Sequence, residues 1–137
     1  MAHSQDLLAC ACLVPQIKKC APCVPYLSDY KRVYDMDLNK DAYEGLKYYF
    51  RMFDPAHKRE AEVFERLGYI DIQNLAKRMK AELLMQTCLV DNICPPSTQF
   101  AMYNKVTSKK SYITYPEYGH ELPSCAYDVL FEFLADL

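Results

Sequence analysis

The chain has little of what marks membrane, secreted or nucleic-acid-binding proteins. Its 137 residues include no tryptophan and only three glycines, and Asp and Glu outnumber Lys and Arg to give a net charge of −2. Lys and Arg form no cluster, so we expect neither nucleic acid nor an acidic membrane surface as a partner. The longest apolar runs, residues 7–14 and 83–90, are far shorter than the roughly 20 residues of a membrane span. We therefore expect no membrane association.

The seven cysteines are an odd number and lack the paired framework of secreted, disulfide-stapled domains. The first residues also lack the basic region of a secretory signal peptide. Both features favour a reducing compartment, and we expect a cytoplasmic protein. With 51% hydrophobic residues the composition is that of an ordinary globular domain, so residues 1–137 are interpreted as one domain. Three glycines are few for a complete α/β domain, which predicts a partial one.

One succession of elements carries most of the functional signal. Residues 83–90 form an uninterrupted apolar run, typical of a strand buried on both faces, and Asp91 follows it. Pro95-Pro96-Ser97 then opens a helical stretch, residues 111–115 resemble a short strand, and His120 comes after them. Strand, aspartate, helix, strand and histidine is the order in which an α/β-hydrolase fold presents the acid and base of its triad.

The remaining elements fit an α/β fold with a mostly parallel sheet flanked by helices. The apolar pattern predicts a helix over residues 7–13 and a strand over 19–24. A charged, tyrosine-rich connection is expected up to Leu38. Residues 39–80 have helical periodicity, broken twice, and are interpreted as a helical insertion between two strands. A last helix begins near Ser124, which we expect to cap it.

Asp91 and His120 are the candidate catalytic residues. A triad aspartate accepts the Nδ1 proton of the histidine, which fixes the tautomer and stabilises the imidazolium formed during catalysis. Both residues must then lie at the carboxyl ends of adjacent strands, as predicted here. Two alternatives stay open: Asp91 caps the helix after Pro95, or His120 is an exposed loop histidine.

Other reactive side chains carry weaker signals. His57 lies in the helical block beside charged residues, which favours a solvated surface position, and His3 lies at a terminus. Cys20 and Cys23 form a Cys-x-x-Cys pair, which in thioredoxin-like proteins is a redox site. There the first cysteine begins a helix, whereas Pro25 disfavours a helix here. A thiol oxidoreductase is thus the weakest alternative.

Several separated motifs are similar to those of the acetyl xylan esterase / cephalosporin-C deacetylase family of α/β-hydrolases. The similarity runs from about Ala9 to Leu137. The motifs that carry it, in the family's order, are Val24–Val33, Leu67–Asp71, Asn74–Ala76, Asp91, Cys94–Thr98, Tyr103–Asn104 and Tyr115–Glu121.

The resemblance implies deacetylation of small acetylated saccharides, such as xylo-oligosaccharide acetates, and of cephalosporin C. It implies a Ser-His-Asp mechanism with Asp91 as the acid and His120 as the base, without metal or cofactor. Members of the family assemble as homo-oligomers, so intact relatives of this chain are expected to do so.

The family's serine stands in a Gly-Gly-Ser-Gln-Gly-Gly turn, and the most similar segment here is Ala2–Asp6 with Ser4 in its place. That turn needs small residues around the serine, a need that Asp6 does not meet. We therefore expect the chain to start after the functional nucleophile and to be inactive alone. The alternative is a non-catalytic hydrolase remnant that acts as an interaction or assembly protein.

Overall fold

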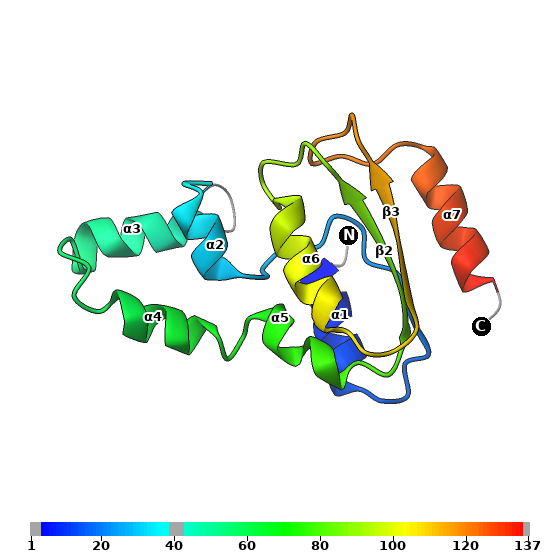
Figure 1. Ribbon diagram of the computed structural model, residues 1–137, viewed down its shortest axis with the longest axis horizontal. Helices are drawn as coiled ribbons and strands as arrows, with labels where there is room; N and C mark the ends of the chain where they lie inside the picture. Colours follow the sequence, from blue (N-terminus) through cyan, green and yellow to red (C-terminus); the bar gives the residue numbers. More distant parts are fainter. Residues whose placement is uncertain (1–3, 39–42, 136–137) are drawn as a thin grey trace.

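The computed structural model describes residues 4–38 and 43–135. A parallel sheet of three strands in the order β1-β2-β3 forms its centre, with helices on both faces (Figure 1). The strands are β1 (Lys19–Cys20), β2 (Glu82–Cys88) and β3 (Lys110–Tyr115). Along β2 and β3 the register runs from Leu83 opposite Lys110 to Cys88 opposite Tyr115. The predicted α/β fold, a parallel sheet flanked by helices, is confirmed.

The central strand β2 is buried on both faces, as its apolar run predicts. Every residue from Leu83 to Cys88 is buried. The strand ends two residues earlier than predicted, because Leu89 and Val90 form an exposed turn. Asp91 therefore lies on a loop beyond the turn and not directly at the end of the strand.

The main hydrophobic core lies between one face of the sheet and four helical segments. These are α1 (Ser4–Leu13), α5 (Ile72–Leu75), the 3-10 helix η2 (Ala76–Arg78) and α6 (Pro96–Lys105). The largest side chains that this core buries completely are Leu8, Ile72, Met79, Leu83, Met85 and Met102.

The helix α7 (Cys125–Leu134) covers the other face of the sheet (Figure 1). Two side chains of the sheet hold it: Gln86 Nε2 donates to the carbonyl of Ala126 at 3.1 Å, and Lys19 Nζ donates to that of Phe133 at 2.7 Å. The helix starts where predicted, but Ser124 has helical dihedral angles and its side chain makes no capping bond.

A helical arm extends to one side of the sheet (Figure 1). It consists of α2 (Tyr30–Asp35), α3 (Glu44–Phe53) and α4 (Glu60–Leu67). The sequence predicted a connection without a helix up to Leu38, whereas the structure has the helix α2 there. It forms because the side chain of Asp29 accepts from the amide of Arg32, and because Tyr30 and Val33 are buried against Tyr43.

Asp71 ties this arm to the sheet-containing body. Its carboxylate is buried and accepts hydrogen bonds from the amides of Asp29 at 3.1 Å and Tyr30 at 3.3 Å. It also caps α5 through the amide of Gln73 at 3.0 Å. One side chain thus joins the start of α2 to the start of α5.

The first strand is shorter than the predicted 19–24. After Cys20 the pairing stops and resumes as an isolated bridge between Cys23 and Gln86. Pro22 explains part of the gap because it has no amide to donate, although its carbonyl still accepts from the amide of Gln86 at 3.0 Å. Among the helices of residues 4–38 and 43–135, none combines the length and the apolar character that a membrane span requires.

Candidate active site

Asp91 is a buried carboxylate held by the loop that follows β2. It is 4% exposed, and its Oδ1 accepts from the amides of Ile93 at 2.9 Å and Cys94 at 2.8 Å. These two bonds fix the orientation of the carboxylate. The predicted alternative of a cap for the following helix is not observed, because α6 has Pro95 at its N-cap and no side-chain capping bond.

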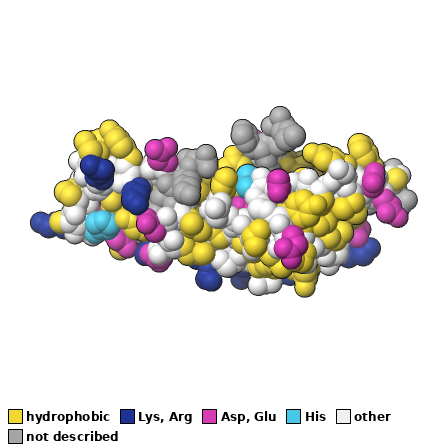
Figure 2. All heavy atoms as spheres, turned by 90° about the horizontal axis from the view of Figure 1, so that it is seen from above, with side chains coloured by type: hydrophobic (Ala, Val, Ile, Leu, Met, Phe, Trp, Pro, Cys, Tyr) yellow, Lys and Arg dark blue, Asp and Glu magenta, His cyan; other side chains and the backbone are white. Residues whose placement is uncertain are grey.

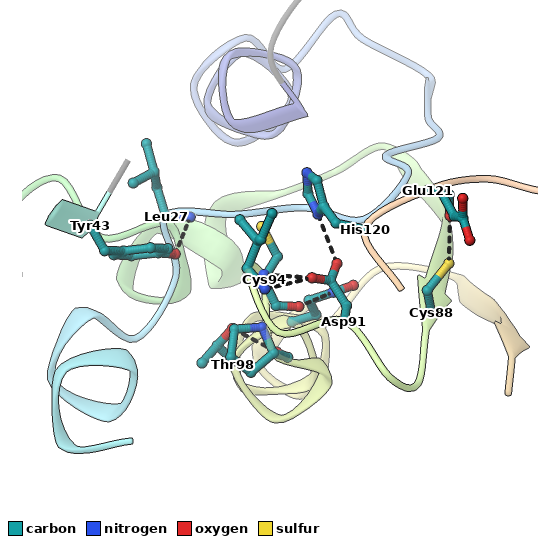
Figure 3. Close-up of polar contacts among 11 residues, drawn as sticks. Leu27, Tyr43, Cys88, Asp91, Cys94, Thr98, His120 and Glu121 are labelled. Carbon is teal, nitrogen blue, oxygen red and sulfur yellow. Dashed lines mark hydrogen bonds and ion pairs between the residues drawn. The ribbon is translucent and has the colours of Figure 1, made fainter. Parts of the chain in front are cut away.

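His120 lies on the loop after β3 and faces the second oxygen of that carboxylate. Its Nδ1 is 2.9 Å from Asp91 Oδ2, as Figure 3 shows. An ionised carboxylate only accepts hydrogen bonds, so Nδ1 carries the proton of this contact. In the neutral ring the lone pair is then on Nε2. The His120 side chain is 37% exposed while that of Asp91 is fully buried, so the imidazole bridges the buried acid and the surface.

Three contacts connect the two loops that carry the pair. The amides of Leu89 and Val90 donate to the carbonyls of Tyr115 at 3.1 Å and Tyr118 at 3.2 Å. The thiol of Cys88 lies 3.0 Å from the Glu121 carbonyl (Figure 3). The end of β2 thereby fixes both ends of the loop that holds His120.

Cys94 is a third reactive side chain at this place, beside the two residues predicted from the sequence. One ligand atom from each of Asp91, Cys94 and His120 lies within 4.8 Å of the other two, and Cys94 is buried. A lone cysteine three residues after an aspartate is a weak signal in a sequence. The fold supplies the rest by bringing His120 to the same loop.

The other candidates lie elsewhere. Burial raises the pKa of Cys20 to about 12 and also raises the pKa of Cys23, which is the reverse of what a redox thiol needs. His57 is in the helical arm, where its ring stacks on Phe50 with centroids 4.6 Å apart and its Nδ1 lies 2.7 Å from Glu60 Oε2. The raised pKa values of Cys20 and Cys23 thus argue against a thiol oxidoreductase.

The serine position is only partly described. Ser4 is the first residue of α1, but its side chain and the whole of His3 lie outside the described part of the structure. Its role as a nucleophile stays a prediction.

The chain matches known esterases along almost all of its length. A family model described as acetyl xylan esterase (AXE1) matches residues 6–137. Acetyl xylan esterase 1 from Thermoanaerobacterium sp. JW/SL YS485 is 51% identical, with a TM-score of 0.95 over 97% of this chain and 42% of that one. An acetyl xylan esterase from Paenibacillus sp. R4 is 34% identical, with a TM-score of 0.93 over the same shares of the two chains.

Among curated proteins, the acetyl esterase Axe7A of Xylanibacter ruminicola is 27% identical over 113 residues, which are 82% of this chain and 24% of that protein. The chain thus spans less than half the length of each of these relatives. The resemblance inferred from the motifs is confirmed, and the chain belongs to the acetyl xylan esterase family.

Proposed function

We propose that this chain supplies the acid and the base of an esterase that removes acetyl groups from small acetylated saccharides. The contact of 2.9 Å between Asp91 and His120 carries the proposal, because it has the orientation that a serine-hydrolase pair needs. Membership of the acetyl xylan esterase family supports the acetyl ester as the bond that is cleaved.

The reaction proceeds in two steps. A serine hydroxyl loses its proton to Nε2 of His120 and attacks the acetyl carbonyl, and the imidazolium then protonates the departing sugar oxygen. Water, deprotonated by the same nitrogen, releases acetate from the acetyl-enzyme. Asp91 accepts the Nδ1 proton of His120 in a hydrogen bond, and the amides of Ile93 and Cys94 hold its carboxylate in the orientation that this bond needs. Only protons and one acetyl group move, so these steps involve no redox cofactor.

Acetylated xylo-oligosaccharides are the substrates that the family relation favours, and cephalosporin C is a second acetyl ester that we propose. Ser4 is the nucleophile candidate within this chain. This chain covers 42% of each of the two solved esterases. In the alternative, the nucleophilic serine lies in a part of the esterase outside the segment that this chain matches.

A chimera tests the proposal. This chain replaces the segment that it matches in the Thermoanaerobacterium esterase, to which it is 51% identical. We expect release of acetate from acetylated xylo-oligosaccharides, with kcat lowered on the order of 10⁶-fold by His120→Ala and about 10⁴-fold by Asp91→Asn. The control is His57→Ala in the arm. A folded, active chimera that tolerates His120→Ala would contradict the proposed role.

An assembly role is a second proposal, supported by exposed apolar side chains. Phe131 and Tyr127 of α7 are 71% and 46% exposed, and Phe53 at the end of α3 is 70% exposed. On the face drawn in Figure 2, hydrophobic side chains gather over the part of the molecule that contains the sheet. Self-association through α7 predicts a dimer or larger species in light scattering that Phe131→Glu dissociates. A monomer at all concentrations would contradict it.

A further inference from the structure

We propose that Asp91, Cys94 and His120 form a binding site for Zn²⁺, and that the bound cation switches off His120 as a base. Within residues 4–38 and 43–135 this is the one group of three or more His, Cys, Asp or Glu side chains close enough to share a metal ion. The three residues lie together in Figure 3, at the carboxyl end of β2. The binding does not depend on the proposed esterase activity.

The spacing suits a tetrahedral cation after a small adjustment. Zinc bonds of about 2.0–2.3 Å place neighbouring ligand atoms roughly 3.4–3.6 Å apart. The Asp91 and His120 atoms start at 2.9 Å, and all three ligand atoms lie within 4.8 Å of one another. Shifts below about 1.5 Å are thus sufficient, and the exposed side of His120 leaves a position for water.

The loop already holds Cys94 in place. Its amide donates to Asp91 Oδ1 at 2.8 Å, and its carbonyl accepts from Gln99 Nε2 at 2.6 Å. Binding therefore needs little ordering of the backbone at this ligand.

The charges and the ligand types also favour zinc. Asp91 and a Cys94 thiolate together carry two negative charges in a buried position, and a divalent cation neutralises both while His120 stays neutral. A thiolate and an imidazole select Zn²⁺ over Mg²⁺ and Ca²⁺, which prefer oxygen ligands.

The cation would change the tautomer of His120. The nitrogen that faces Asp91 is Nδ1, so Nδ1 is the atom that meets the metal. Its proton leaves and the neutral ring carries a proton on Nε2, which is then unable to accept one from a nucleophile. The ring is neutral before and after, so the net release is the one proton of the Cys94 thiol.

Calorimetric titration of the reduced chain with Zn²⁺, in two buffers of different ionisation enthalpy, tests the site. We expect one Zn²⁺ and about one released proton per chain. Loss of a residue that only hydrogen-bonds a metal ligand typically weakens metal binding by about 10- to 100-fold. Cys94→Ser removes a ligand itself, so we expect Zn²⁺ binding to weaken by at least this factor. Cys125→Ser, which removes an exposed thiol of α7, should bind as the unaltered chain does.

His120→Ala is a second test of the site, needed in case the substitution of buried Cys94 disturbs the fold. The His120 side chain is partly exposed, so its removal disturbs the packing less. It should weaken Zn²⁺ binding by a similar factor. With Co²⁺ as the probe, a thiolate-to-metal charge-transfer band should appear in the unaltered chain and be absent in Cys94→Ser. Absence of binding, or equal binding by the unaltered chain and the folded His120→Ala variant, would overturn the proposal.

Discussion

The thiol of Cys88 donates to the carbonyl oxygen of Glu121 across 3.0 Å, so the last residue of β2 bonds directly to the residue that follows His120. Cys88 is completely buried. Its bond, together with those of Leu89 and Val90, connects the loop of the acid to the loop of the base.

Replacing this thiol should loosen the connection. Cys88→Ala removes a part-buried hydrogen bond and the sulfur of a buried side chain, and we expect the free energy of unfolding to fall by about 1–2 kcal/mol. Denaturant titration measures the loss. Cys125→Ala on the exposed side of α7 is the matched control and should change stability by less than about 0.5 kcal/mol. Equal effects of the two substitutions would show that the bond has no structural role.

The buried carboxylate of Asp71 should control the arm. Asp71→Ala leaves the amides of Asp29, Tyr30 and Gln73 without their acceptor. The cost is about 1–3 kcal/mol for the buried amide of Tyr30 and less for the two part-buried amides. We expect hydrogen exchange to accelerate in α2 more than in β2. Asp71→Asn keeps one acceptor oxygen and should have an intermediate effect. Uniform acceleration throughout the chain would contradict this local role.

Alkaline pH should destabilise the fold through two buried thiols. Burial raises the pKa of Cys20 to about 12 and that of Cys12 to about 11, whereas the ordinary value is 9.0. At a pH between the ordinary pKa of 9.0 and the raised pKa values, these thiols have lost their protons in the unfolded chain and still hold them in the folded chain. Rising pH therefore favours unfolding. This contribution to stability is complete below pH 9 and is lost as the pH rises toward 12.

Thermal unfolding as a function of pH checks this dependence. Tm should decline above pH 9, and the decline should be shallower in Cys20→Ala than in Cys10→Ala, whose thiol is exposed in α1. A decline that Cys20→Ala leaves as steep would assign the effect to other groups.

The isolated chain should hydrolyse p-nitrophenyl acetate no faster than its own His120→Ala variant. The reason is that Asp6 stands next to the candidate Ser4 turn, where the family's turn has small residues. The absorbance of released p-nitrophenolate gives the rates for the unaltered chain, Ser4→Ala and His120→Ala. A rate that falls in both variants and not in His57→Ala would instead identify Ser4 as a working nucleophile.

The sequence predicted those features that depend on local pattern. The apolar run before Asp91 predicted a buried strand. The succession of elements up to His120 predicted that both residues follow the carboxyl ends of neighbouring parallel strands. The helix α2 was missed because it is short and depends on Asp71, a residue 41 positions away from Tyr30. The nearness of Cys94 to His120 was missed for the same reason, since only tertiary structure brings the two loops together.

The carboxylate of Asp91 should hold the proton of His120 on Nδ1 and leave Nε2 free to act as the base. Long-range nitrogen–proton correlation spectra of the metal-free chain at a pH where the ring is neutral report the tautomer directly. We predict protonated Nδ1 and unprotonated Nε2 for His120, and loss of this preference in Asp91→Ala. A neutral His120 with its proton on Nε2 in the unaltered chain would show that this nitrogen is not the base.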